Sequence, residues 1–186
     1  DRENADFERA VTSVQQHFGR TAIQVQQPIG KEKKFSGLID LISVKASQYT
    51  HDGSGRPKPC EIPDLNKETV QKGHEAIVEM VAEGDDQLME QFFDQGTLSN
   101  EDLIPAFKQA VSDRKIFPIF ASSALLNVGS QDLIEGIITY LPSPEHTTPR
   151  LTDENNSGRV GKTDEPVSIY IFKTLADPFA ARLSYL

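Results

Sequence analysis

The spacing of apolar residues divides the chain into helical and extended stretches. In residues 6–18 apolar side chains recur every three or four positions until Gly19, which predicts a helix that ends at the glycine. Residues 21–30 alternate apolar and polar positions and end in Pro-Ile-Gly, a pattern typical of a strand followed by a turn. Residues 35–50 are rich in β-forming residues and predict one long strand or a bent pair.

Residues 51–64 have the composition of a loop, and three helices are predicted after them. They cover 66–83, 85–95 and 99–113, where apolar residues again follow a helical period. Ser99 and Asp102 resemble a capping pair for the third helix. Pro105 lacks the N–H that a helix interior needs, so that helix is expected to start nearer Asp102 or to kink.

The pattern from residue 115 onward predicts a strand over 115–120, a turn over 121–129 and a helix over 130–141. The run 151–166 is almost entirely polar and is interpreted as a linker or mobile loop. Beyond it, alternating apolar residues predict two strands joined at Asp177-Pro178. Two strands alone are marginally stable in water, so this last element is expected to be incomplete.

Composition places the chain among soluble globular proteins. It has 186 residues, 37% of them hydrophobic and 25% charged, and no apolar run approaches the ~20 residues of a membrane helix. No secretory leader is visible, and the single Cys60 cannot form an internal disulfide, so we expect a cytoplasmic protein. The net charge of −9 argues against stand-alone nucleic-acid binding. Because the first residue is Asp1 rather than Met, the chain is expected to be a piece of a longer protein.

Several short motifs resemble binding or catalytic sites, but the residues around them do not fit those sites. The stretch "NSGRVGKT" over 156–163 resembles a phosphate-binding loop, but it lacks the first glycine and the helix that must follow, so a plain loop is predicted. The serines of "ASSAL" have no flanking glycines of a hydrolase elbow. The four histidines have no metal-site spacing. The sequence therefore predicts no catalytic residue and no metal site.

Two short motifs at distant positions resemble those of the translation elongation factor G family of GTPases. "DRENADF" is similar to the end of the family's Asn-Lys-x-Asp motif, with Asp1 as its aspartate, and "SAL" is similar to the second guanine loop. The resemblance implies that Asp1, Ser123, Ala124 and Leu125 bind guanine. A carboxylate can accept hydrogen bonds from guanine N1 and N2 while a loop amide donates to O6, a combination that adenine does not satisfy.

The long separation of these motifs resembles the inserted subdomain of that family. The implied fold is α/β: the C-terminal part of a P-loop GTPase-type doubly wound domain with an inserted α+β subdomain, followed by a truncated β-barrel start. Residues 1–20 and 115–144 would be the remnant of the GTP-binding domain, and 21–114 the insertion with its own core. Residues 145–186 would be a linker and the first barrel strands.

The resemblance implies a fragment of a ribosome-dependent GTPase that drives translocation in protein synthesis. The parent would bind GTP or GDP with Mg²⁺. Residues 1–186 carry no phosphate cradle, so this piece is expected to be inactive, with at most trace guanine affinity. Exposed edges are expected to make it self-associate.

Three alternatives remain open from the sequence. Residues 66–113 could be a protein-binding module that docks the ribosomal stalk protein. The parent could be a GTPase of the release factor 3 type. Within the elongation factor G family, the chain could come from the housekeeping factor or from a paralogue.

Overall fold

The computed structural model describes residues 1–143, 145, 150–151, 158–159, 162, 164, 167, 169, 171–177 and 181–185. The chain forms two compact units, Asp1–Leu141 and Pro142–Leu186. The first unit contains all five helices of the described residues, a parallel strand pair and a four-stranded antiparallel sheet, so it is a mixed α/β structure.

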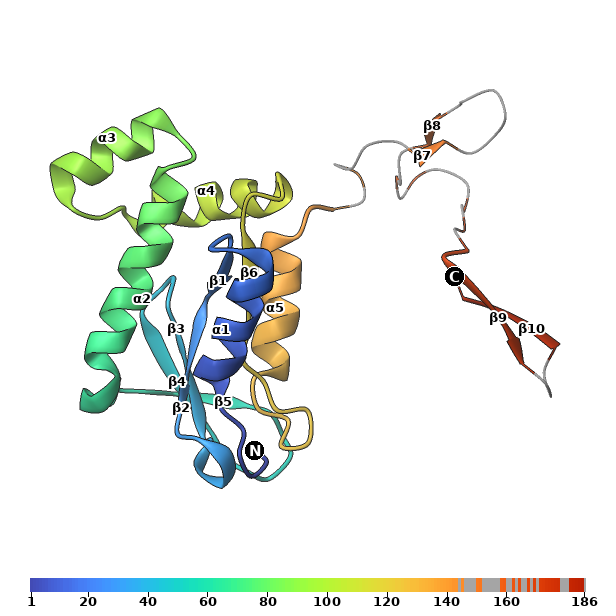
Figure 1. Ribbon diagram of the computed structural model, residues 1–186, viewed down its shortest axis with the longest axis horizontal. Helices are drawn as coiled ribbons and strands as arrows, with labels where there is room; N and C mark the ends of the chain where they lie inside the picture. The colour runs from blue at the N-terminus through green and yellow to red at the C-terminus, as the bar shows by residue number, and fades with distance from the viewer. Residues whose placement is uncertain are drawn as a thin grey trace. The chain divides into compact units, whose positions relative to one another are not determined.

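The parallel pair is built from segments far apart in the chain. β1 (Ala22–Gln24) and β6 (Phe117–Ile119) pair in parallel, and Figure 1 shows α1 (Phe7–Phe18) and α5 (Ser130–Tyr140) beside them. The predicted first helix is confirmed: it begins after Asp6, whose carboxylate accepts the Arg9 N–H at 3.0 Å, and ends at Gly19 with φ 76°. The predicted strand, turn and helix over 115–141 are confirmed as well.

The antiparallel sheet has the order β2-β3-β4-β5. Its strands are β2 (Gln26–Ile29), β3 (Gly37–Asp40), β4 (Lys45–Tyr49) and β5 (Pro57–Cys60), and a short 3₁₀ turn, η1 (Glu32–Lys34), joins the first two. The predicted strand over 21–30 is therefore split between β1 and β2. Residues 35–50 form the expected pair, with Val44 at φ 55° in the connecting turn.

The loop prediction over 51–64 was wrong at β5, which lies at the edge of the sheet. Pro57 and Pro59 suggested a loop because proline cannot donate a ladder hydrogen bond. An edge strand tolerates them, since one of its sides needs no partner strand.

The three middle helices are α2 (Asp64–Ala82), α3 (Asp86–Gln95) and α4 (Asn100–Ser112), as the periodicity predicts. The expectation that Pro105 delays the start of α4 was wrong, because the helix begins at Asn100 and continues through the proline. The Ser99 hydroxyl accepts the Asp102 N–H at 3.3 Å and so caps the helix. The carbonyl left without a helical partner belongs to Glu101, an exposed residue whose carbonyl water can reach.

The larger core lies between the antiparallel sheet and helices α2 and α4. Leu41 and Ile42 after β3, Val70 and Ile77 of α2, and Phe107 of α4 are all at most 2% exposed. Ile23, Val25 and Ile116 of the parallel pair and its flanks join the same cluster. The inserted range thus supplies most of this core.

A smaller apolar cluster connects the antiparallel sheet to the turn after β6. It consists of Phe35, Leu38 and Tyr49 from the sheet side and Ala121 and Val128 from the turn, all buried. Because these residues come from both sides of the predicted domain boundary, packing between the two parts is direct.

The second unit is described by itself. β7 (Arg150–Leu151) pairs with β8 (Gly158–Arg159), and β9 (Lys173–Asp177) pairs with β10 (Ala181–Tyr185), both antiparallel. Two strands joined near Asp177 are thus present, but the first is shorter than predicted: it begins at Lys173, and Val167, Ile169 and Ile171 lie outside it. The ring centroids of Phe172 and Tyr185 are 6.3 Å apart. The "NSGRVGKT" stretch lies mostly outside the described residues. Among the described helices, none has the length and apolar character that a membrane crossing requires.

Candidate functional site

Asp1 and Ser123 lie in contact although 122 positions separate them. The Ser123 hydroxyl donates a 2.8 Å hydrogen bond to Asp1 Oδ2, and the same hydroxyl oxygen accepts the Leu126 N–H at 3.2 Å. Ser123 is 5% exposed, so its hydroxyl is held between these two partners. Ser123 therefore holds one oxygen of the Asp1 carboxylate, and within the described residues this carboxylate has no other hydrogen bond or ion pair.

The turn that carries Ser123 is closed by backbone hydrogen bonds. Ser123 and Val128 exchange N–H···O bonds of 2.8 and 3.0 Å, and the Asn127 N–H donates to the Ala124 carbonyl at 3.3 Å. Asn127 at φ 53° and Gly129 at φ 77° allow the chain to reverse here. We call residues 121–129 together with Asp1 the corner.

Two predicted site residues stand at the outer tip of the corner. Ala124 is exposed, and Leu125 is 80% exposed. Neither backbone N–H has a hydrogen-bond partner among the described residues, so both can donate to an outside acceptor. The structure thus brings together all four residues that the sequence singled out.

The chemistry of the corner suits the edge of guanine. A carboxylate oxygen that remains open can accept N–H groups, while N–H donors from the neighbouring turn can satisfy a carbonyl oxygen. Adenine presents an amino donor where guanine presents O6, so the same set of groups would leave polar atoms unsatisfied. The donor and acceptor types therefore fit a guanine base.

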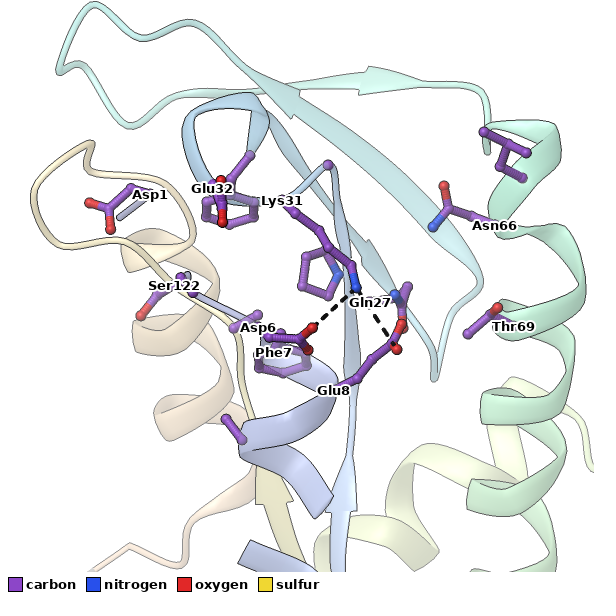
Figure 2. Close-up of a pocket in the computed structure, with 17 residues that line it drawn as sticks. Asp1, Asp6, Phe7, Glu8, Gln27, Lys31, Glu32, Asn66, Thr69 and Ser122 are labelled. Carbon is purple, nitrogen blue, oxygen red and sulfur yellow. Dashed lines mark hydrogen bonds and ion pairs between the residues drawn. The ribbon is translucent and has the colours of Figure 1, made fainter. Parts of the chain in front are cut away.

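A cavity of about 580 Å³ lies next to the corner, and Asp1, Ala121 and Ser122 form part of its lining. Figure 2 shows it between the first turn of α1, the segment around Lys31 and the start of α2. Lys31 Nζ lies 3.4 Å from Asp6 Oδ2 and 4.0 Å from Glu8 Oε2. In this view the Asp1 carboxylate points away from Lys31, so its open side faces away from the middle of the cavity.

The one basic side chain that lines the cavity is already paired with carboxylates. The hydrogen bond from the Arg9 backbone N–H, together with the nearby charge of Lys31, holds the pKa of Asp6 below its ordinary value. Lys31 is the single basic side chain of the lining and is shared by two carboxylates, which leaves no isolated cation for an anionic ligand. The hydrogen-bond donors and acceptors of the corner are therefore more specific for one ligand than the groups that line the cavity.

The other residues with suggestive chemistry have ordinary contacts. His17, His51 and His74 each contact a backbone carbonyl at 2.8–2.9 Å, and His146 lies outside the described residues. Cys60 is a half-buried thiol on β5. Over the described part of the chain, no three His, Cys, Asp or Glu side chains are placed to hold a metal ion.

Comparison with known proteins bears on the fold of the chain. No family model matches the chain. Its structure is similar to part of a crystal structure of a protein from Thermus thermophilus, with a TM-score of 0.70 and 23% sequence identity. The match covers 98% of this chain and 25% of the other, so the chain spans about a quarter of that protein. At this identity the likeness shows a shared fold alone.

Proposed function

We propose that this chain is part of a translational GTPase of the elongation factor G type and that its corner reads guanine. The observation that carries the proposal is the 2.8 Å hydrogen bond from Ser123 to Asp1. Two motifs that a guanine site needs side by side are in contact, with most of a domain between them in sequence. The open N–H groups of Ala124 and Leu125 supply the donors that O6 of guanine requires.

The corner accounts for base recognition only. GTP hydrolysis also needs donors around the β- and γ-phosphates, a Mg²⁺ ligand and a positioned water. We assign none of these to residues 1–186, so GTP and Mg²⁺ would be bound with the help of other parts of the parent protein. The 186-residue chain alone is proposed to be inactive, and the parent to act in the translocation step on the ribosome.

An exchange of base specificity tests the proposal in the intact protein. Asp1→Asn replaces one acceptor with a donor, which suits xanthine because that base carries a carbonyl at position 2. We expect the variant to lose about tenfold or more in GDP affinity and to gain affinity for xanthosine diphosphate, since each misplaced polar group costs roughly 1–3 kcal/mol.

Asp6→Asn is the matched control, because Asp6 is five positions away and caps α1 instead of facing the corner. It should leave both nucleotide affinities unchanged. Fluorescent GDP and xanthosine diphosphate analogues measure the two dissociation constants. Intact protein that binds neither GDP nor GTP, or an Asp1→Asn variant that keeps full GDP affinity, would contradict the proposal.

A second function, docking of the ribosomal stalk protein, is favoured by the distribution of charge. Residues 61–113 contain thirteen Asp or Glu and three Lys or Arg, while the rest of the chain contains fifteen and sixteen. The whole net negative charge therefore belongs to the region of α2, α3 and α4, which would attract a basic surface of a partner.

Salt dependence and charge reversal test the docking function. Binding of the stalk protein's C-terminal domain to the 186-residue chain should weaken as ionic strength rises. Reversal of Glu90, an exposed residue of α3, to lysine should weaken it further, whereas Glu8→Lys on α1 should not. Absence of binding at low salt would exclude this function.

A further inference from the structure

The antiparallel sheet supports the corner at three points. At the start of the turn, the Ala121 N–H donates to Gln26 Oε1 at 3.1 Å, a buried contact between residues 95 positions apart. Gln26 is 2% exposed and is the first residue of β2. The position at which the chain leaves β6 and enters the corner is therefore fixed by a side chain of the antiparallel sheet.

The second support holds the end of the corner. The Tyr49 hydroxyl, on the last residue of β4, donates to Asp132 in the first turn of α5. Tyr49 is 4% exposed, and burial, followed by the hydrogen bond to Asp132, raises the pKa of its phenol, so the hydroxyl remains a donor at neutral pH. Because α5 has Gly129 at its N-cap and no side-chain cap, this contact is a polar anchor for its first turn.

The third support is the connection between β4 and β5. The Asn127 side-chain amide donates to the Gly53 carbonyl at 3.0 Å. Gly55 is buried at φ 67°, and a Cβ at this position would lie 2.5 Å from Asn127 Nδ2. Any larger residue would push the connection away from the corner, so the two loops are in close contact.

Apolar packing joins the three polar supports. Leu38 of β3 is 2% exposed and lies so close to Gly129 that a Cβ there would come within 2.7 Å of its methyl group. Leu38 also belongs to the buried cluster with Ala121 and Val128. Both ends of the turn that holds Ser123 thus rest on the antiparallel sheet.

We propose that the antiparallel sheet sets the guanine affinity of the corner, with Gln26, Tyr49 and Asn127 as positioning residues. This inference rests on the proposed function. Ser123 can hold the Asp1 carboxylate only while the turn keeps its place, and the sheet determines that place. A partner that displaces the sheet would therefore loosen the grip on the base, and one that holds the sheet would tighten it.

The test measures nucleotide release from the intact protein loaded with fluorescent GDP. Tyr49→Phe removes the hydroxyl that reaches Asp132, and Asn127→Gly removes the amide without strain, because glycine accepts φ 53°. Each is expected to raise the GDP dissociation rate by up to about tenfold, the scale of one lost hydrogen bond.

Tyr140→Phe is the matched control. Tyr140 is half-buried against Phe107, with ring centroids 5.1 Å apart, and within the described residues its hydroxyl bonds to no part of the corner. It should leave the dissociation rate unchanged. Asp132→Asn keeps an acceptor for Tyr49 and should release GDP at a rate close to that of the wild type, whereas Asp132→Ala should resemble Tyr49→Phe.

The melting temperature of each variant separates positioning from general stability. Variants that melt earlier but release GDP at the wild-type rate would overturn the inference and leave the proposed function intact. Wild-type protein that binds no GDP would overturn both. If Tyr49→Phe does not fold, Asn127→Gly on the surface loop decides, and a wild-type rate for it counts against the inference.

Discussion

Helices α4 and α5 have similar lengths and pack in opposite ways. α4 buries Leu103 and Phe107 completely in the larger core, where Phe107 also packs against Tyr140 of α5. α5 presents Ile134, Ile137 and Ile138 to solvent, with exposed fractions of 57, 49 and 73%. Only its other side is covered, where Gly136 allows the Phe120 ring to approach so closely that a Cβ would lie 2.4 Å away.

The difference shows that the two parts of the first unit bury their apolar surfaces to different extents. The sheet and helices α2 and α4 bury most of their apolar side chains in the larger core. The parallel pair and α5 leave apolar side chains exposed, among them Phe117 on β6, which is 50% exposed. Parallel sheets are normally covered on both faces, so this region has the character of an interface.

The largest expected effect comes from replacing one apolar side chain of each helix with alanine. Phe107→Ala should lower the free energy of unfolding by about 3–5 kcal/mol, because it removes a fully buried ring and leaves a cavity. Ile138→Ala, at 73% exposure, should change it by less than about 0.5 kcal/mol. Urea unfolding followed by circular dichroism measures both. Equal losses would contradict the contrast between the helices.

The exposed face of α5 should mediate self-association of the 186-residue chain. We predict dimers or larger species by light scattering, and Ile138→Glu should shift the mass toward the monomer because a charge cannot be buried in an apolar contact. Thr139→Glu adds the same charge at the next exposed position and should have a smaller effect. A monomeric wild-type chain at all concentrations would show that the face does not drive association.

The helices of the first unit could be predicted from the sequence because their apolar residues repeat with a helical period. Exposure could not be predicted in the same way: Phe18 of α1 is 71% exposed and Phe93 of α3 is 77% exposed, although both lie on apolar stripes. Periodicity identifies a face, and only the neighbouring elements decide whether that face is covered.

The residues of the candidate site likewise include some that the sequence could predict and some that it could not. Asp1 and Ser123–Leu125 could be named from two short motifs and a family resemblance. Gln26, Tyr49 and Asp132 could not, because each acts through a partner more than eighty positions away and none belongs to a local pattern. The sequence signal at Tyr49 is its place at the end of a predicted strand, which fits an ordinary core residue equally well.

The smallest expected effect is a local response to acid. It should appear in the connection between β4 and β5, which contacts the corner, and not in the core under α4. Asp52 lies in the connection between β4 and β5, where hydrogen bonds from Ser54, and then from Thr50, lower its pKa from 3.8 to about 2. A carboxyl with a lowered folded-state pKa contributes stability above its unfolded pKa and loses that contribution as the pH falls through the folded value.

The connection that carries Gly53 should therefore loosen between about pH 4 and pH 2, while the core under α4 responds less, because it is held by fully buried apolar side chains such as Leu103 and Phe107. Amide hydrogen exchange, corrected for its intrinsic pH dependence, would report this as faster exchange at Ser54, whose N–H bonds Asp52 Oδ1 at 2.8 Å. Asp52→Asn should remove the pH dependence, and Asp94→Asn on α3 should not. If Ser54 and Val111 of α4 lost protection together over this range, the acid response would be global unfolding, and the two sides of the unit would not differ in the way that their packing indicates.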